Sequence, residues 1–73
     1  MSNTNYRETD FYKKLTPYLA TAYAEGFCEG EGASEEEQFA AFQFIYDKKL
    51  YLSLQGWFGR ACKHLLEAGL IQK

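Results

Sequence analysis

The fold is decided by the stretch Leu52-Ser53-Leu54-Gln55-Gly56-Trp57-Phe58-Gly59-Arg60, which joins two segments with helical patterns. It holds the only tryptophan of the chain and two of its six glycines. Gly56 follows a short apolar segment, so we expect it at the left-handed C′ position that ends a helical turn. Gly59 is expected where two helices approach each other closely. The stretch is therefore predicted to be a tight corner between a short helix and the last helix.

The segment after this corner, residues 58–68, has the pattern of an amphipathic helix. Its apolar residues recur every three or four positions, which makes one inward stripe: Phe58, Ala61, Cys62, Leu65 and Leu66. Arg60, Lys63 and His64 fall on the opposite face. Gly69 follows as the predicted C-cap glycine.

The clearest local signal in the chain is Ser34-Glu35-Glu36-Glu37. Ser34 at the N-cap and Glu37 at the third helical position form a capping box. Three carboxylates in a first turn also suit the positive end of a helix dipole. We therefore interpret this acidic cluster as structural, not as metal ligands or general acids, and expect the helix to run to about Asp47. Lys48-Lys49 indicates a break after it.

A second helix is predicted over residues 17–25. Thr16 suits the N-cap, and Pro17 suits the first helical position, where its missing N–H costs nothing. Gly26 would supply a left-handed stop. Residues 10–15 are also expected to be helical, and one kinked helix from 10 to 25 stays open as the alternative.

The chain has 73 residues, which allows one domain. We predict an all-α fold, a compact bundle of three to four short helices over residues 9–73, with residues 1–8 as a flexible N-terminal tail. Six Phe, six Tyr and one Trp are many rings for so small a core. They indicate either a core rich in rings or rings that cover a partner.

Charge and cysteine usage narrow the classes of function. The formal net charge of −2 gives no electrostatic reason to expect nucleic-acid or membrane binding. Acids gather between residues 25 and 37, and bases in the last third of the chain. No signal-peptide region or long apolar run is found, so we expect no export and no membrane span. Cys28, in a predicted loop at 27–33, and Cys62, on an apolar helix face, lack the spacing of a metal or redox pair, which favours a cytoplasmic, reduced protein.

No catalytic signature is found, so we expect no enzyme activity, no metal and no cofactor. The chain has one histidine, which excludes a metal site built from several histidines. Arg60 lies in the first turn of a helix, where its charge opposes the dipole. It should therefore pair either with the Glu35–Glu37 cluster or with an external anion. Trp57 is expected either to plug the space between the corner and the first helix or to be an exposed anchor for a partner.

The run from Gly30 through Ile71 resembles a group of small uncharacterised proteins of tailed bacteriophages. The shared features are a Leu-Gln-Gly-aromatic-Gly-Arg corner, here within residues 54–60, and a Leu-Ile-Glu-Ala-Gly-like ending, here Leu65-Leu66-Glu67-Ala68-Gly69. The sequence departs from the group at Lys48-Lys49, where a Thr-Gly-like helix stop is expected. The resemblance implies a phage origin and a phage lifestyle, and no particular activity. We expect the protein to lie in the cytoplasm of the host cell.

The favoured hypothesis is a small non-catalytic phage accessory protein that binds a host protein during infection, as an inhibitor or adaptor. The candidate binding residues are Tyr51, Trp57, Arg60, Lys63 and His64. The alternative is a nucleic-acid-binding module resembling a helix-turn-helix that uses the last helix, which the net charge opposes. A third hypothesis is a homo-oligomer that buries rings between copies.

Overall fold

The computed structural model describes residues 6–26, 31–54 and 56–73. The elements, in chain order, are η1 (Tyr6–Glu8), α1 (Asp10–Lys13), α2 (Pro17–Glu25), α3 (Glu35–Asp47), η3 (Leu50–Leu52) and α4 (Gly56–Glu67). Across these described ranges there are four α-helices and no strand, which confirms the predicted all-α bundle of short helices. Among them, no helix is both long and apolar enough to cross a bilayer.

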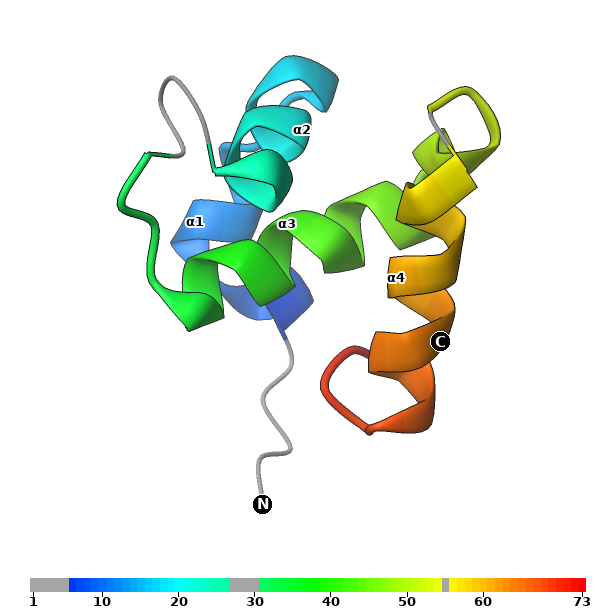
Figure 1. Ribbon diagram of the computed structural model, residues 1–73. Helices are drawn as coiled ribbons and strands as arrows, with labels where there is room; N and C mark the ends of the chain where they lie inside the picture. Colours follow the sequence, from blue (N-terminus) through cyan, green and yellow to red (C-terminus); the bar gives the residue numbers. More distant parts are fainter. Residues whose placement is uncertain (1–5, 27–30, 55) are drawn as a thin grey trace.

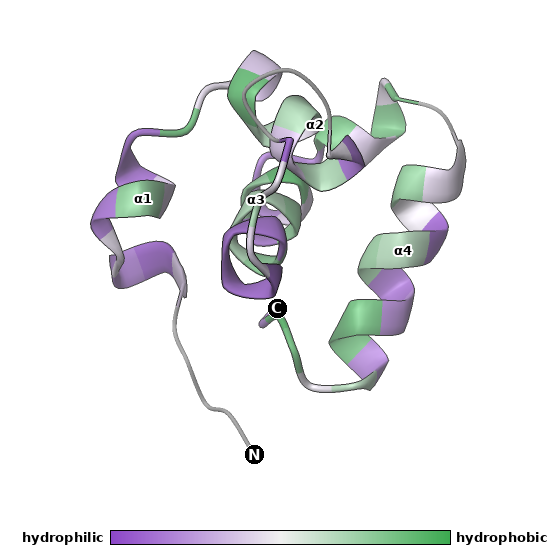
Figure 2. Cartoon of the chain, turned by 60° about the vertical axis from the view of Figure 1, so that its left-hand side comes forward, coloured by the Kyte–Doolittle hydropathy of each residue, from purple (hydrophilic) through white to green (hydrophobic). Residues whose placement is uncertain are grey.

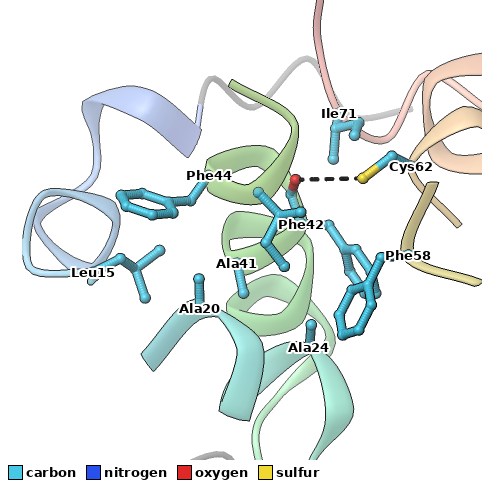
Figure 3. Packing of buried hydrophobic residues seen from close by; sticks show 10 residues of the cluster. Leu15, Ala20, Ala24, Ala41, Phe42, Phe44, Phe58, Cys62 and Ile71 are labelled. Carbon is cyan, nitrogen blue, oxygen red and sulfur yellow. Dashed lines mark hydrogen bonds between the residues drawn. The ribbon is translucent and has the colours of Figure 1, made fainter. Parts of the chain in front are cut away.

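Helix α3 is the centre of the bundle (Figure 1). α2, α1 and η1 pack on it from one side, while η3 and α4 pack on it from the other. For this reason α3 is buried over six consecutive residues, from Ala40 through Ile45. Figure 3 shows the side chains that meet around it, which belong to one cluster of buried residues: Leu15, Ala20, Ala24, Ala41, Phe42, Phe44, Ile45, Phe58, Cys62 and Ile71. The small alanines of α2 and α3 let the two helix backbones come close.

The start of α2 lies where the sequence predicts it. The Thr16 hydroxyl accepts a hydrogen bond from the backbone N–H of Leu19 at 3.2 Å, and Pro17 is the first helical residue. Gly26 ends α2 with a φ of 77°. Because Lys14 ends α1 and the chain is not helical at Leu15 and Thr16, the alternative of one kinked helix is wrong.

The predicted capping box of α3 is present. The backbone N–H of Glu37 donates to the Ser34 hydroxyl at 3.2 Å, and the Ser34 N–H donates to the Glu37 carboxylate at 3.0 Å. Two of the orphan N–H groups of the helix are thus satisfied, and Ser34 and Glu37 have the structural role expected for them.

The corner differs from its prediction in one respect. α4 begins at Gly56 and not at residue 58, and Gly56 is not among the residues with positive φ. The left-handed turn lies earlier, at Lys49, with a φ of 57°. The chain therefore leaves α3 at the predicted Lys48-Lys49 break, and Gly56 is a helix start, not a left-handed stop; Gln55 lies outside the described residues.

The structure corrects the prediction at the N-terminal end of the domain and confirms the one at Gly69. The predicted tail extends too far, because Tyr6–Glu8 form a helical turn on α3 in which Tyr6 is buried. Residues 1–5 lie outside the described part of the chain, as does Cys28 in the predicted loop. Gly69 has the predicted left-handed conformation, with a φ of 76°, and lets Ile71 fold back into the core.

Alanine substitutions at Gly69 and at Gly56 should therefore have different effects on the free energy of unfolding. Gly69→Ala should lower the free energy of unfolding by about 1 kcal/mol, because an alanine resists positive φ. Gly56→Ala should be neutral or slightly stabilising, since its new Cβ would meet only the flexible end of Arg60, at 3.4 Å. Urea unfolding of both variants measures the difference. An equal loss in both would contradict the assignment of helix start and helix stop.

Candidate partner-binding surface

The residues predicted to bind a partner gather on and beside the outward face of α4. Arg60, Lys63 and His64 are exposed, while Tyr51 and Trp57 are half-buried at the edges of this face. Hydrophilic and apolar residues alternate along α4 (Figure 2), as expected for a helix with one face in solvent. We call these five residues the α4 surface.

Trp57 has a structural role and keeps some exposure. Its indole stacks on Phe58 with ring centroids 4.0 Å apart, and meets the edge of Phe42 at 6.2 Å. The ring thus packs between the corner and α3. Because the side chain is only half-buried, part of it is open to a partner.

Tyr51 forms the other edge of the surface. Its ring stacks on Tyr46, with centroids 6.1 Å apart and planes 13° apart. A Cβ at Gly59 would lie 3.8 Å from the Tyr51 ring, so the glycine marks the approach of η3 to α4 at an ordinary contact distance. The close approach of two helices predicted at Gly59 is therefore not found, because a Cβ would fit at this position.

Arg60 does not pair with the Glu35–Glu37 cluster, so the internal hypothesis for its charge is wrong. The cluster lies at the first turn of α3, whereas α4 begins beside the other end of that helix (Figure 1). Within the described residues, the one salt bridge joins Arg7 to Asp47. Arg60 instead places its guanidinium near Gly56, in solvent.

An exposed apolar side chain adjoins this surface. η3 packs against α4, and Leu52 on η3 is 73% exposed. An isolated exposed leucine is ordinary. Beside two half-buried rings, however, it adds apolar area to the cations of α4.

Sequence reasoning missed a second polar cluster, which joins both ends of the chain to α3. We call it the polar clasp, and its members are Arg7, Tyr12, Gln43, Asp47 and Gln72. Arg7 donates from Nε and Nη2 to the two Asp47 carboxylate oxygens, each at 2.7 Å, and from Nη2 to the Gln72 carbonyl at 2.9 Å. The Tyr12 hydroxyl donates to Asp47 at 2.7 Å. Asp47 is thereby held by two segments that precede α3 in the chain.

Gln43 ties the C-terminal segment into the same cluster. Its side chain is 0% exposed and pairs with the backbone of Gln72, donating to the carbonyl and accepting from the N–H, each at 2.7 Å. Its amide also donates to Asp47 at 3.1 Å. No buried side-chain oxygen or nitrogen in the described ranges lacks a hydrogen-bond partner, so the clasp is a satisfied network.

These contacts change the acidity of two clasp residues. Burial alone would raise the pKa of Asp47, but the hydrogen bonds from Arg7, Tyr12 and Gln43 and the charge of Arg7 outweigh it, and the pKa lies below 3.8. Burial, with the hydrogen bond to Asp47, raises the pKa of Tyr12 from 10.0 to about 12.

Stability should therefore depend on pH at both extremes. For Asp47, the contribution is complete above the unfolded pKa of 3.8 and is lost as the pH falls through the lower folded value. For Tyr12, the contribution is complete below pH 10.0 and is lost as the pH rises toward 12. Urea unfolding between pH 2 and pH 12 should show both losses, and an Asp47→Asn variant should lack the acid one. Parallel acid profiles in the variant and the parent chain would contradict this role of Asp47.

The cysteine of the described ranges is a core residue. Cys62 is buried, its Sγ lies 3.9 Å from the Phe42 carbonyl, and burial raises the pKa of its thiol to about 11. The thiol is therefore protonated at neutral pH and serves as a core side chain. No group of three or more His, Cys, Asp or Glu residues in the described ranges is arranged to hold a metal ion.

Comparison of the chain with protein-family models, with curated protein sequences and with solved structures finds no match.

Proposed function

We propose that this chain is a small non-catalytic binding protein and that the α4 surface contacts its partner. The observation that carries the proposal is Arg60, an exposed arginine in the second turn of α4 with no ion pair among the described residues. Its guanidinium is free to form charge-assisted hydrogen bonds with an external carboxylate. Arginine, tryptophan and tyrosine are also the residues enriched in the energetic centres of protein interfaces.

The resemblance to small tailed-bacteriophage proteins supports a host protein as the partner. The chain would then act in the host cytoplasm during infection, by occupying a surface as an inhibitor or by joining two proteins as an adaptor. The half-buried rings favour a protein over a nucleic acid, because the partner would cover apolar area as well as charge. The chain's net charge of −2 favours the same choice.

The test compares two charge reversals of equal size on different faces. Arg60→Glu/Lys63→Glu changes the α4 surface, and Lys13→Glu/Lys14→Glu changes two exposed lysines at the end of α1. Affinity capture from host lysate, followed by measurement with the purified partner, should show binding reduced at least about tenfold in the first variant. The second variant should bind like the parent chain. Equal binding by all three proteins would refute the proposal.

Duplex DNA is titrated at low and moderate salt with the same proteins. DNA binding with a steep salt dependence that Arg60→Glu/Lys63→Glu abolishes would indicate nucleic acid, and not a protein, as the partner.

Sedimentation over a range of concentrations tests self-association. A dimer that the same reversal dissociates would assign the surface to a second copy.

A further inference from the structure

A cleft of about 270 Å³ lies on the other side of α3 from the α4 surface, between the first turn of α3 and the η1–α1 segment. We call it the acidic cleft. The residues that line it include two acids and no base: Tyr6, Thr9, Phe11, Ser34, Glu36, Glu37 and Ala40. Its volume is below the roughly 300–1,000 Å³ of pockets for small-molecule ligands. It has room for one long side chain.

Most polar groups of this cleft are already engaged. The Thr9 hydroxyl donates to the Tyr6 carbonyl at 2.7 Å and accepts from the Tyr12 N–H at 3.2 Å. Ser34 and Glu37 satisfy each other in the capping box. A ligand would therefore be recognised by polar groups of the cleft that form none of these hydrogen bonds.

Two groups remain, the Tyr6 hydroxyl and the Glu36 carboxylate. Neither forms a hydrogen bond or ion pair with another described residue. Tyr6 is only 6% exposed, yet no buried side-chain oxygen in the described ranges lacks a partner. The hydroxyl therefore reaches solvent, and Tyr6 is one of the residues that line the cleft. Tyr6 and Glu36 line the same cleft, and burial and the charge of Glu36 raise the pKa of Tyr6.

These features define the chemistry of the occupant. A carboxylate and a phenol on an apolar wall suit a cation with an apolar stem, and the carboxylates of the first turn repel an anion. A guanidinium fits better than an ammonium, because it is planar, lies flat on an aromatic ring and donates to two acceptors at once. Phe11 and Ala40 supply apolar surface for the stem.

We propose that the acidic cleft binds an arginine side chain of a protein partner, with the guanidinium at Glu36 and Tyr6 and its stem against Phe11. This site is independent of the α4 surface and lies at the opposite side of the domain. A partner that engages both would bind an acidic group at α4 and present an arginine here. The proposal stands or falls separately from the proposed function.

The test uses N-acetyl-arginine amide as the probe and the neutral N-acetyl-citrulline amide as its isosteric control. Both are titrated into the ¹⁵N-labelled full chain. Arginine amide should give saturable shifts at the backbone N–H groups of Tyr6, Phe11, Glu36 and Ala40, and citrulline amide should not. Glu36→Gln should weaken binding about fivefold or more, as expected for the loss of one charge-assisted hydrogen bond.

Glu35→Gln is the matched control, because Glu35 carries the same charge one residue earlier and does not line the cleft. It should bind like the parent chain, as should Arg60→Glu/Lys63→Glu. Equal weakening in Glu35→Gln would reduce the effect to the general charge of the helix start and overturn the site. Shifts of equal size with N-acetyl-lysine amide would overturn the preference for arginine. Shifts that grow with the protein's own concentration and vanish in Arg60→Ala would assign the cleft to a second copy, and would overturn the assignment to another protein.

Discussion

Asp47→Ala should lower the free energy of unfolding by about 3 kcal/mol, the largest loss expected from any polar side chain of the domain. Asp47 accepts four hydrogen bonds, from two nitrogens of Arg7, from Tyr12 and from Gln43. A hydrogen bond to a charged group contributes about 1.5–3 kcal/mol, and partial exposure of Arg7 reduces the sum through solvent screening. For a domain of this size the melting temperature should fall by about 12–24 °C.

Glu67→Ala is the control for this prediction. Glu67 is an exposed carboxylate in the last turn of α4, so its loss should change stability by less than about 0.5 kcal/mol. A double-mutant cycle with Arg7→Ala should give a coupling energy of about 1 kcal/mol or more, because the two side chains share two hydrogen bonds. If the Asp47→Ala and Glu67→Ala variants have the same melting temperature, the polar clasp contributes nothing to stability.

The helix boundaries were predictable where a single turn of chain determines them. The capping box of Ser34 and Glu37, the Thr16-Pro17 start and the Gly26 stop all depend on residues within four positions of one another. Their chemistry is complete before any tertiary contact forms, so the sequence pattern alone identifies them. The fold class follows from these boundaries and from the apolar stripe of the last helix.

The corner shows where local chemistry is ambiguous. Glycine permits positive φ but does not require it, so Gly56 was equally suited to a helix stop and a helix start. The left-handed residue is Lys49, and no sequence rule selects a lysine for that conformation. Its position follows from how η3 and α4 pack against α3, which the sequence does not state.

The polar clasp was missed because its members are far apart in the chain. Arg7 lies 40 residues from Asp47 and 65 from Gln72. Seen alone, Arg7 belongs to a polar segment without periodicity, and Asp47 to a helix end rich in charges. One signal was present in Gln43, a polar residue within the apolar run of α3, since a buried amide must find partners.

For the candidate binding residues, too, local features were predictable from the sequence and tertiary contacts were not. The exposure of Arg60, Lys63 and His64 was predictable, because helical periodicity places them opposite the apolar stripe. The lack of an ion pair between Arg60 and the Glu35–Glu37 cluster was not predictable, since it depends on which end of α3 meets α4. The acidic cleft was beyond sequence reasoning for the same reason, as it joins η1 and α1 to a helix start about 30 residues later.

Phe58→Ala should have the largest effect of any single truncation on α4, about 3–5 kcal/mol of unfolding free energy. Phe58 is 1% exposed and lies between Trp57, at 4.0 Å, and Phe42, at 6.4 Å between ring centroids. A domain of this length has a total stability of roughly 4–11 kcal/mol, so the loss would leave a large unfolded fraction near body temperature. Urea unfolding and amide hydrogen exchange over α4 measure it, and Leu52→Ala, at an exposed site of η3, is the apolar control with a change below about 0.5 kcal/mol.

This variant also tests how the α4 surface is held. Besides α3, α4 packs against η3, and Phe58 is its most buried anchor in the core. Phe58→Ala leaves all five residues of the surface in place, yet partner binding should fall because their common backbone loses its position. Phe58→Leu, which refills most of the volume, should restore both stability and binding in part. If Phe58→Ala lost stability but bound as tightly as the parent chain, a short segment of α4 and not its docked geometry would be what the partner recognises.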